Sequence, residues 1–389
     1  MSVIGLTQSR DGRSLAPSSD EVPFVGRQAQ LQVLHESLRR VERGNTAAVF
    51  VMGESGIGKS RLLSAASDRL RTAGALVLSG ACLDIGDSSP LHPLRQALRR
   101  YQPAAGRAGV LSGAAANELI SVLDGEARHP DGAGDLLERL TRGLGAVAAG
   151  RTLVLVMDDL QWADLTTRHL LLYLLAGLGD VRLLLLGAAR TETLRGDDPI
   201  RRMLLELRRS RSRSGAVHVL DLEPLDRTET AQLVAELLGG DPEPDLAESV
   251  WRRSGGVPFV AEELARDARD GRDGLSETLS EITLAHVDAL PADAQLVSHA
   301  VAAGVEPVAH DLLARVAQLG EDRLLQAVRE AVGQRVLLSE PDGYRFRYPL
   351  IREVLEPRLL PGERVRWHRR YAEALAAGKA NDDALDAYE

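Results

Sequence analysis

The chain has 389 residues, 44% of them hydrophobic and 26% charged, which is ordinary for a globular protein of two or three domains. Its formal net charge of -9 argues against a protein built mainly to coat nucleic acid, because binding to a phosphate backbone requires a basic face. Cys82 is the only cysteine, which excludes an intramolecular disulfide and a cysteine-built zinc site. Without a signal-peptide pattern or an apolar run near the ~20 residues that cross a bilayer, the sequence predicts a cytoplasmic protein with no membrane partner.

The N-terminal part predicts a leader followed by a helix. Residues 1–22 are rich in Ser, Gly, Asp and Pro and lack apolar periodicity, so we expect them to be disordered. Order is expected to begin at residues 24–27, FVGR. Apolar residues then recur at helical spacing between positions 31 and 41, which predicts an amphipathic helix before the first strand.

A phosphate-binding pattern follows that helix. Residues 47–52 form an apolar, β-prone run, and the next eight residues, GESGIGKS, match G-x-x-x-x-G-K-S. A plain glycine-rich turn is the alternative, but the flanking strand and helix patterns favour a phosphate loop. Lys59 would then reach the β- and γ-phosphates of a nucleotide, and the Ser60 hydroxyl would bind Mg²⁺. The predicted loop comprises Gly53, Glu54, Ser55, Gly56, Ile57, Gly58, Lys59 and Ser60.

Three further apolar runs predict an α/β core with a parallel sheet. Residues 153–157 have the uninterrupted apolar character of a strand that is buried on both faces, residues 181–188 predict another such strand, and residues 216–220 predict the last strand of the sheet. Helical patterns, including a basic helix over residues 200–213, separate them. Ligands in such folds lie at the carboxyl ends of the strands.

Two of these runs end in charged residues that are candidates for catalysis. Asp158 is expected to bind Mg²⁺ directly or through water, and Asp159 to act as the general base for the attacking water. Arg190, at the end of the next strand, would contact the γ-phosphate. The alternatives are an acidic pair that caps the next helix and a solvated strand-end arginine, and the pairing with a phosphate loop favours the catalytic roles.

From residue 226 onward the pattern becomes helical. Asp226 and Glu229 predict a capping box at the start of a helix, and residues 270–274, DGRDG, predict a linker. Two short strands around Pro341, Asp342 and Gly343 predict a hairpin, and helices followed by one hairpin indicate a winged-helix unit. The predicted helices span 228–238, 245–253, 258–268, 279–290, 292–303, 308–319, 321–332 and 362–377, and the hairpin strands span 336–339 and 344–348.

Together these motifs carry a resemblance to a known family. The FVGR segment, the phosphate loop, VMDDLQWAD at 156–164, Arg190 and GGVPF at 255–259 resemble the ATPase module of the large ATP-binding regulators of the LuxR family. Those regulators belong to the STAND class of signal-transduction ATPases, which are related to the AAA ATPases. Residues 344–360, YRFRYPLIREVLEPRLL, are similar to the winged-helix end of the same module. The resemblance covers residues 24–377.

The resemblance implies further site residues. Val25 and Gly26 would lie against adenine, Pro258 would pack on the base or ribose, and Arg27 and Arg61 are counted with the nucleotide-binding residues. A winged-helix histidine contacts the β-phosphate of ADP in related proteins, and this chain has Tyr348 where that histidine is often found. A tyrosine hydroxyl can also donate a hydrogen bond to phosphate.

The resemblance implies a switch that binds ATP, ADP and Mg²⁺ and hydrolyses ATP slowly, as the regulatory core of a LuxR-type transcriptional regulator. We expect self-association in the ATP state, and contact with DNA only through a C-terminal helix-turn-helix that is not visible in this sequence. An AAA-type motor or remodelling enzyme and a DNA-binding winged-helix module are alternatives, while a small-molecule kinase lacks a recognisable acceptor site. The expected domains are a leader at 1–22, a P-loop ATPase core at 23–224, a helical lid at 225–270, a winged-helix domain at 275–360, and a C-terminal helix and tail at 361–389.

Overall fold

The computed structural model describes residues 24–44, 46–83, 90–100, 115, 117–123, 133–176, 181–192, 194, 198–209, 216–271 and 275–386. The predicted leader at 1–22 and the end of the predicted linker at 272–274 lie outside these residues. So does the end of the predicted basic helix, at residues 210–213. None of the described helices is both long and apolar enough to cross a lipid bilayer.

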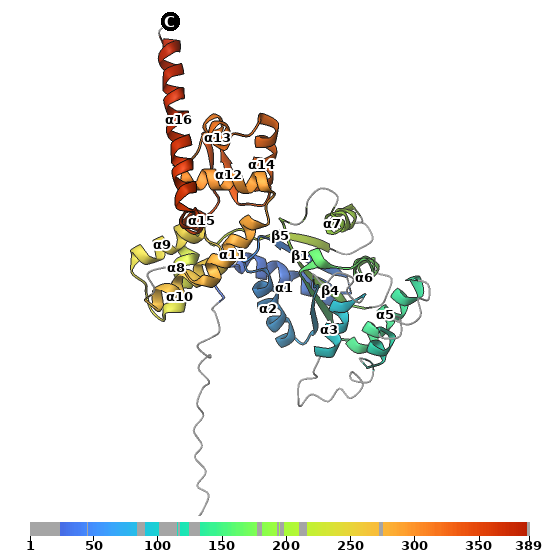
Figure 1. Cartoon of the computed structure of the whole chain (residues 1–389). Coiled ribbons are helices and arrows are strands. Elements are labelled where there is room, and N and C mark those ends of the chain that lie inside the picture. Colours follow the sequence, from blue (N-terminus) through green and yellow to red (C-terminus); the bar gives the residue numbers. More distant parts are fainter. Residues whose placement is uncertain are drawn as a thin grey trace, which may run out of the picture.

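A five-stranded parallel sheet forms the core of the N-terminal half (Figure 1). The strands lie in the order β2-β3-β4-β1-β5, so β1 is hydrogen-bonded to both β4 and β5. This confirms the predicted α/β fold, and every residue of β1 is buried, as its apolar run requires. The strands are β1 (Ala47–Gly53), β2 (Leu76–Ala81), β3 (Leu153–Asp158), β4 (Leu183–Arg190) and β5 (Ala216–Asp221).

Helices cover both faces of the sheet. Successive side chains of a strand point to opposite faces, and accordingly Val49 packs in one apolar cluster with α1 and α2, whereas Phe50 packs in another with α3, α5, α6 and α7. The sole cysteine, Cys82, is buried in the second cluster. The helices are α1 (Gln28–Glu42), α2 (Lys59–Thr72), α3 (His92–Arg100), α5 (Ala133–Ala148), α6 (Leu165–Leu175) and α7 (Pro199–Arg209).

Three helices follow the sheet: α8 (Arg227–Leu238), α9 (Pro244–Ser254) and α10 (Pro258–Arg269). The predicted capping box is confirmed at the start of α8. The Asp226 carboxylate accepts from the Glu229 N–H at 2.8 Å, and the Glu229 carboxylate accepts from the Asp226 N–H at 3.1 Å. We refer to α8–α10 as the lid.

The remaining described chain is helical except for one hairpin, and we call residues 275–386 the C-terminal unit. The predicted helices and hairpin are all present, with shifted ends. The second hairpin strand ends at Phe346 and not at residue 348, because Pro349 begins the next helix and Tyr348 precedes it as the N-cap. The elements are α11 (Glu277–Asp288), α12 (Ala292–Ala303), α13 (His310–Ala317), α14 (Glu321–Gly333), β6 (Leu337–Glu340), β7 (Gly343–Phe346), α15 (Pro349–Leu355) and α16 (Pro361–Asp386).

Other helix boundaries also differ from the prediction, as α13 and α16 illustrate. The helix expected from residue 308 starts at His310, because Val308 exchanges two backbone hydrogen bonds with Tyr344 at 2.8 and 2.9 Å. The last helix, α16, continues past residue 377 to Asp386 and projects away from the rest of the molecule (Figure 1).

One apolar cluster joins the lid to the C-terminal unit. It runs from Val25 and Leu233 through Leu279 and Val301 to Trp367, across the predicted linker. The two clusters that cover the sheet are separate from it. The lid and the C-terminal unit therefore share one hydrophobic core, which is separate from the cores of the α/β sheet.

Candidate functional site

The predicted phosphate loop lies between β1 and α2. Gly56 and Gly58 have φ angles of 75° and 94°, a backbone region that residues with a side chain rarely adopt. Gly58 is the N-cap of α2, whose N-terminus carries the positive end of the helix dipole. The glycines of the motif thus occupy positions where glycine is required, and the loop opens onto an anion-favouring helix end.

Lys59 is folded back over this loop. Its ammonium donates hydrogen bonds to the Gly53 carbonyl at 3.0 Å and to the Glu54 carbonyl at 2.7 Å. Lys59 is buried, and burial lowers its pKa, while Glu192 is the foremost of the carboxylates that oppose this shift. An incoming phosphate would replace uncharged carbonyls with a charged partner, which makes stronger hydrogen bonds.

The ends of β3 and β4 are linked by a side chain that had no role in the sequence prediction. Gln161 donates to the Asp159 carboxylate at 2.7 Å and accepts from the Arg190 N–H at 3.1 Å. The Arg190 guanidinium lies 3.6 Å from the same Asp159 oxygen, and the Asp158 carboxylate accepts from the Asp159 N–H at 2.8 Å. Gln161 belongs to the DDLQWAD stretch, which was the available signal for it.

A hollow in front of the loop brings most of the predicted catalytic residues together. Lys59, Ser60, Asp159 and Arg190 all line it, whereas Asp158 does not. The other residues that line this hollow, which we call the phosphate hollow, are Ser55, Gly56, Gly58, Arg61, Pro258, Phe259 and Glu262.

A second, more apolar hollow adjoins the first. Val25, Arg27 and Ile57 line it together with Phe24, Leu225 and Leu233, and it shares Gly58, Arg61, Pro258 and Glu262 with the phosphate hollow. Arg27 donates to the Ile57 carbonyl at 3.3 Å, and burial lowers its pKa. Gly26, with φ 69°, lies so close to the Glu229 side chain that a Cβ would clash with it. Of the residues predicted to contact the base or ribose, Val25 and Pro258 therefore line this hollow, whereas Gly26 does not.

The lid is attached directly to the loop and to α2. The Phe259 N–H donates to the Gly56 carbonyl at 3.2 Å, at the start of α10. Arg61 forms an ion pair with Glu262, a buried carboxylate whose pKa is raised by burial against the opposing effect of Arg61. Arg61 and Glu262 line both hollows, and their ion pair connects α2 to the lid.

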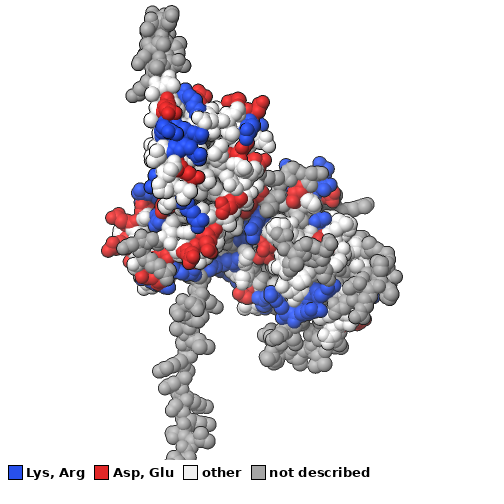
Figure 2. Space-filling model, viewed as in Figure 1, with Lys and Arg blue, Asp and Glu red and all other residues white. Residues whose placement is uncertain are grey.

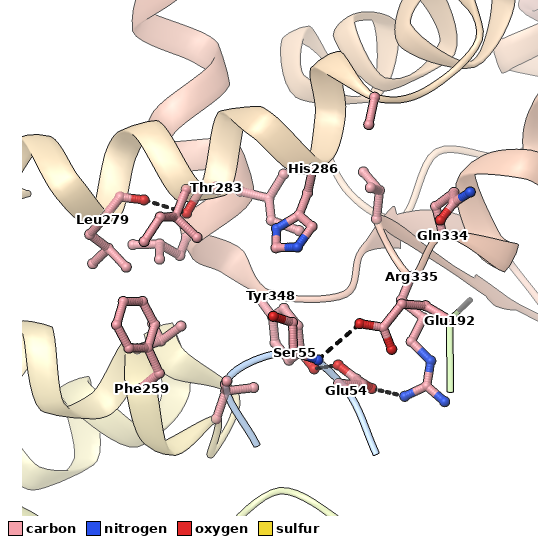
Figure 3. A pocket seen from close by; sticks show the side chains of 18 residues that line it. Glu54, Ser55, Glu192, Phe259, Leu279, Thr283, His286, Gln334, Arg335 and Tyr348 are labelled. Carbon is pink, nitrogen blue, oxygen red and sulfur yellow. Dashed lines mark hydrogen bonds and ion pairs between the residues drawn. The ribbon is translucent and has the colours of Figure 1, made fainter. Parts of the chain in front are cut away.

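The Glu54 side chain lies away from these hollows and contacts the C-terminal unit. Its carboxylate, on a residue only 7% exposed, is ion-paired with Arg335 and accepts from the Tyr348 hydroxyl (Figure 3). It is also ion-paired with Arg347 at 2.5 Å. Arg347 also donates to the Tyr348 hydroxyl at 3.1 Å, and burial raises the pKa of Tyr348. We call Glu54, Arg335, Arg347 and Tyr348 the Glu54 cluster.

Tyr348 is thereby placed differently from the expected contact with phosphate. Its hydroxyl contacts the side chain of the loop, and Tyr348 does not line the phosphate hollow. Its ring packs against Gly255 of the lid so closely that a Cβ there would clash. Arg335 was missed in the sequence because it stands outside any motif. Arg347 lies in the stretch 344–360, but that pattern assigned it no role.

The fold and the loop first define a class of protein. A parallel sheet whose inner strand β1 leads into a glycine-rich phosphate loop and a helix is the fold of a P-loop NTPase. Residues 23–186 match the family model of the AAA ATPase domain, so this part of the chain is an AAA-type ATPase domain.

Two solved structures are similar to this chain at low sequence identity, and the first of them shares its fold. The Walker-type ATPase PABY2304 of Pyrococcus abyssi superposes with a TM-score of 0.55 at 14% identity, over 88% of this chain and 99% of that one. A STAND protein with a tetratricopeptide repeat sensor from Pyrococcus horikoshii gives a TM-score of 0.38 at 15% identity, over 92% and 46% of the two chains. The second similarity is too distant to carry an argument.

One relative is similar in sequence over most of the chain. It is an uncharacterized protein of Rhizobium meliloti (strain 1021), 27% identical over 91% of this chain. This chain spans 37% of the length of that relative.

Proposed function

We propose that this chain is an ATP- and ADP-binding switch that hydrolyses ATP slowly, and that it is the regulatory ATPase core of a LuxR-type regulator of the STAND class. The observation that carries the proposal is the Glu54 cluster, in which one residue of the phosphate loop contacts both Lys59 and the C-terminal unit. In this proposal residues 23–224 are the ATPase core, 225–270 a lid, 275–360 a winged-helix domain and 361–389 a C-terminal helix and tail.

The two adjoining hollows support nucleotide binding. Adenine would lie in the apolar hollow beside Val25 and Pro258, and the phosphates in the hollow lined by Lys59 and Ser60. Mg²⁺ keeps several waters and needs few protein ligands, so the Ser60 hydroxyl and a water-mediated contact to Asp158 fit its requirements. When bound, Mg²⁺ would neutralise charge on the β- and γ-phosphates.

The contacts of Asp159 support slow hydrolysis. Its carboxylate is engaged by Gln161 and lies 3.6 Å from Arg190. A γ-phosphate would draw the Arg190 guanidinium toward itself, and Asp159 would then orient the attacking water. Because Arg190 must leave Asp159 before each turnover, we expect ATP hydrolysis to be slow, as a switch requires.

The Glu54 cluster would report the state of the loop to the C-terminal unit. The Glu54 carbonyl accepts from Lys59, and its carboxylate is held by Arg335, Arg347 and Tyr348. When Lys59 turns to the phosphates, the loop backbone at Glu54 loses one partner. A nucleotide can shift the equilibrium between two conformations of the chain only if it binds them with different affinity. The γ-phosphate contacts of Lys59 and Arg190 must therefore supply the difference in affinity between ATP and ADP.

The direct test is to identify the nucleotide that co-purifies with the chain and to measure phosphate release against protein concentration. We expect bound ADP or ATP and a rate far below one turnover per second. A steep, cooperative rise to many turnovers per second would favour the motor alternative. Absence of nucleotide binding by calorimetry would contradict the proposal.

The DNA-binding alternative is tested by a mobility shift of the full chain with duplex DNA at low salt, where non-specific affinity is greatest. On the face shown in Figure 2, acidic as well as basic side chains cover the C-terminal unit. Glu353 and Glu356 lie on and beside α15, and Glu340 on β6. We therefore expect no shift of the DNA.

The expected self-association is tested by light scattering of the chain with ATP and with ADP.

A further inference from the structure

The two hollows of the proposed nucleotide site meet along four residues. Gly58, Arg61, Pro258 and Glu262 line both of them. In a nucleotide the ribose joins the base to the phosphates. With the base in the apolar hollow and the phosphates in the phosphate hollow, the ribose has to lie where the hollows meet. The proposed function leaves the hydroxyls of that ribose without a partner.

Of the four shared residues, only Arg61 and Glu262 have polar side-chain groups. Glycine has no side chain, and the proline ring is hydrocarbon. The guanidinium only donates hydrogen bonds, whereas an ionised carboxylate only accepts them. A hydroxyl can do both, so this pair is chemically complementary to the two neighbouring hydroxyls of a ribose.

The Glu262 carboxylate has one oxygen in reserve. Oε1 is ion-paired with Arg61, while the contact of Oε2 to Arg266 measures 4.0 Å, which is too long for a hydrogen bond. Oε2 accepts no hydrogen bond from the described residues, yet it is not closed off from solvent. This oxygen is therefore available to a donor that a ligand brings.

The surroundings of Glu262 favour an uncharged donor. The residue is buried, and a buried carboxylate oxygen gains from any hydrogen bond that replaces its lost water. Arg61 already balances the charge of the carboxylate. A hydroxyl adds the missing hydrogen bond and leaves that balance unchanged.

A purely structural ion pair between α2 and the lid is the alternative. Such a pair adds little net stability, because the cost of desolvating both groups offsets their attraction. A structural pair also has no need to line both hollows, as Arg61 and Glu262 do. The position of the pair therefore favours a role in binding.

We propose that Glu262 is the residue that recognises the ribose, by accepting a hydrogen bond from its 2′ or 3′ hydroxyl, and that the site prefers ribonucleotides to deoxyribonucleotides. This inference rests on the proposed nucleotide function. A site that is built to bond a hydroxyl rejects the analogue that lacks it, because the buried acceptor then stays unpaired.

The ribose contact is independent of the γ-phosphate. Glu262 lies on α10 of the lid, so the contact attaches any bound nucleotide to the lid, whether it is ATP or ADP. The preference for the ribose is therefore the same for diphosphates and triphosphates. Diphosphates are the better probes, because they remain intact during the measurement.

The test measures the affinity of the full chain for ADP, 2′-deoxyADP and 3′-deoxyADP by calorimetry. We expect at least one of the deoxy analogues to bind about 10-fold more weakly than ADP, the scale of a hydrogen bond to a charged group. Binding of both analogues within 2-fold of ADP would overturn the inference and leave the proposed function standing. If none of the three binds, the proposed function falls, and the inference falls with it.

Two variants assign the preference to Glu262. Glu262→Met removes the acceptor and should bring the affinities for ADP and the weaker analogue to within 2-fold, whereas a structural role would weaken both nucleotides alike and keep their ratio. Arg61→Met breaks the same ion pair but leaves the carboxylate, so it should keep the preference. A preference that persists in Glu262→Met, or one that is lost equally in Arg61→Met, would overturn the role of Glu262.

The matched control is Glu263→Gln. Glu263 is the next residue of α10 and is ion-paired with Arg266, but it lines neither hollow. Its substitution should change neither the affinity for ADP nor the preference for ADP over the deoxy analogues. Because the measurement on the unaltered chain needs no substitution, it decides the inference even where a variant fails to fold.

Discussion

The two halves of the phosphate loop lie in different environments. Residues 56–60 line the two hollows, and among the described residues the Lys59 ammonium donates only to the loop's own carbonyls. The Glu54 side chain, in contrast, is buried among three side chains of the C-terminal unit. One short loop thus has two parts: a ligand half, residues 56–60, which lines the hollows, and a committed half, Glu54, whose side chain is held by the C-terminal unit.

The largest expected effect is on the ligand half. Lys59→Ala should weaken ATP and ADP binding by about 100-fold or more, equivalent to about 2.7 kcal/mol, because the phosphates lose a charged donor. Calorimetry measures it. Arg71→Ala, which removes an exposed cation from the same helix, is the control and should bind nucleotide normally. Unchanged affinity in Lys59→Ala would remove this half of the loop from the nucleotide site.

The second effect separates binding from hydrolysis in the same hollow. Asp159→Asn should lower phosphate release by about 100-fold, the scale of a lost general base, while ADP affinity stays within 3-fold of the unaltered chain. The asparagine still accepts from Gln161, so the local structure should persist. Normal turnover in this variant would exclude Asp159 from the mechanism.

The third effect concerns the committed half. A double-mutant cycle with Glu54→Gln and Arg347→Met should give a coupling free energy of about 1–2 kcal/mol in denaturant unfolding, because the two groups form a largely buried ion pair. Glu36→Gln is the control for Glu54, as an exposed carboxylate on α1. A coupling near zero would show that the contact does not hold the two regions together.

The last effect tests how closely the Tyr348 ring packs against the lid. Gly255→Ala should destabilise the fold by about 1–3 kcal/mol more than Gly239→Ala, because of overpacking against the Tyr348 ring. Both glycines have positive φ, 58° and 74°, but nothing lies within 4 Å of a Cβ at Gly239. Equal losses in urea unfolding would mean that only backbone strain is involved.

The ligand half of the loop was predictable from sequence, because nucleotide chemistry demands glycines, a lysine and a hydroxyl at fixed spacing. The strands were predictable for a related reason: burial on both faces requires an uninterrupted apolar run, as in residues 153–157. Gln161 belongs to the DDLQWAD motif, but the motif does not predict its contacts to Asp159 and Arg190.

The committed half was not predictable. Glu54 occupies a position that the motif leaves open, and its partners Arg335 and Arg347 lie 281 and 293 residues away. Such pairs depend on how distant elements pack, which neither periodicity nor local propensity encodes. The same holds for Tyr348, whose position beside Glu54 follows from the docking of the C-terminal unit on the loop.

In the proposed switch the state of the nucleotide reaches the C-terminal unit through Glu54, and hydrogen exchange of residues 337–355 is the measurement that tests this role. Exchange would be followed with ADP, with a non-hydrolysable ATP analogue, and in Glu54→Gln. We predict that the ATP analogue lowers protection of this segment relative to ADP, and that Glu54→Gln lowers it in both states and removes the difference. Identical protection with both nucleotides in the unaltered chain would contradict the account.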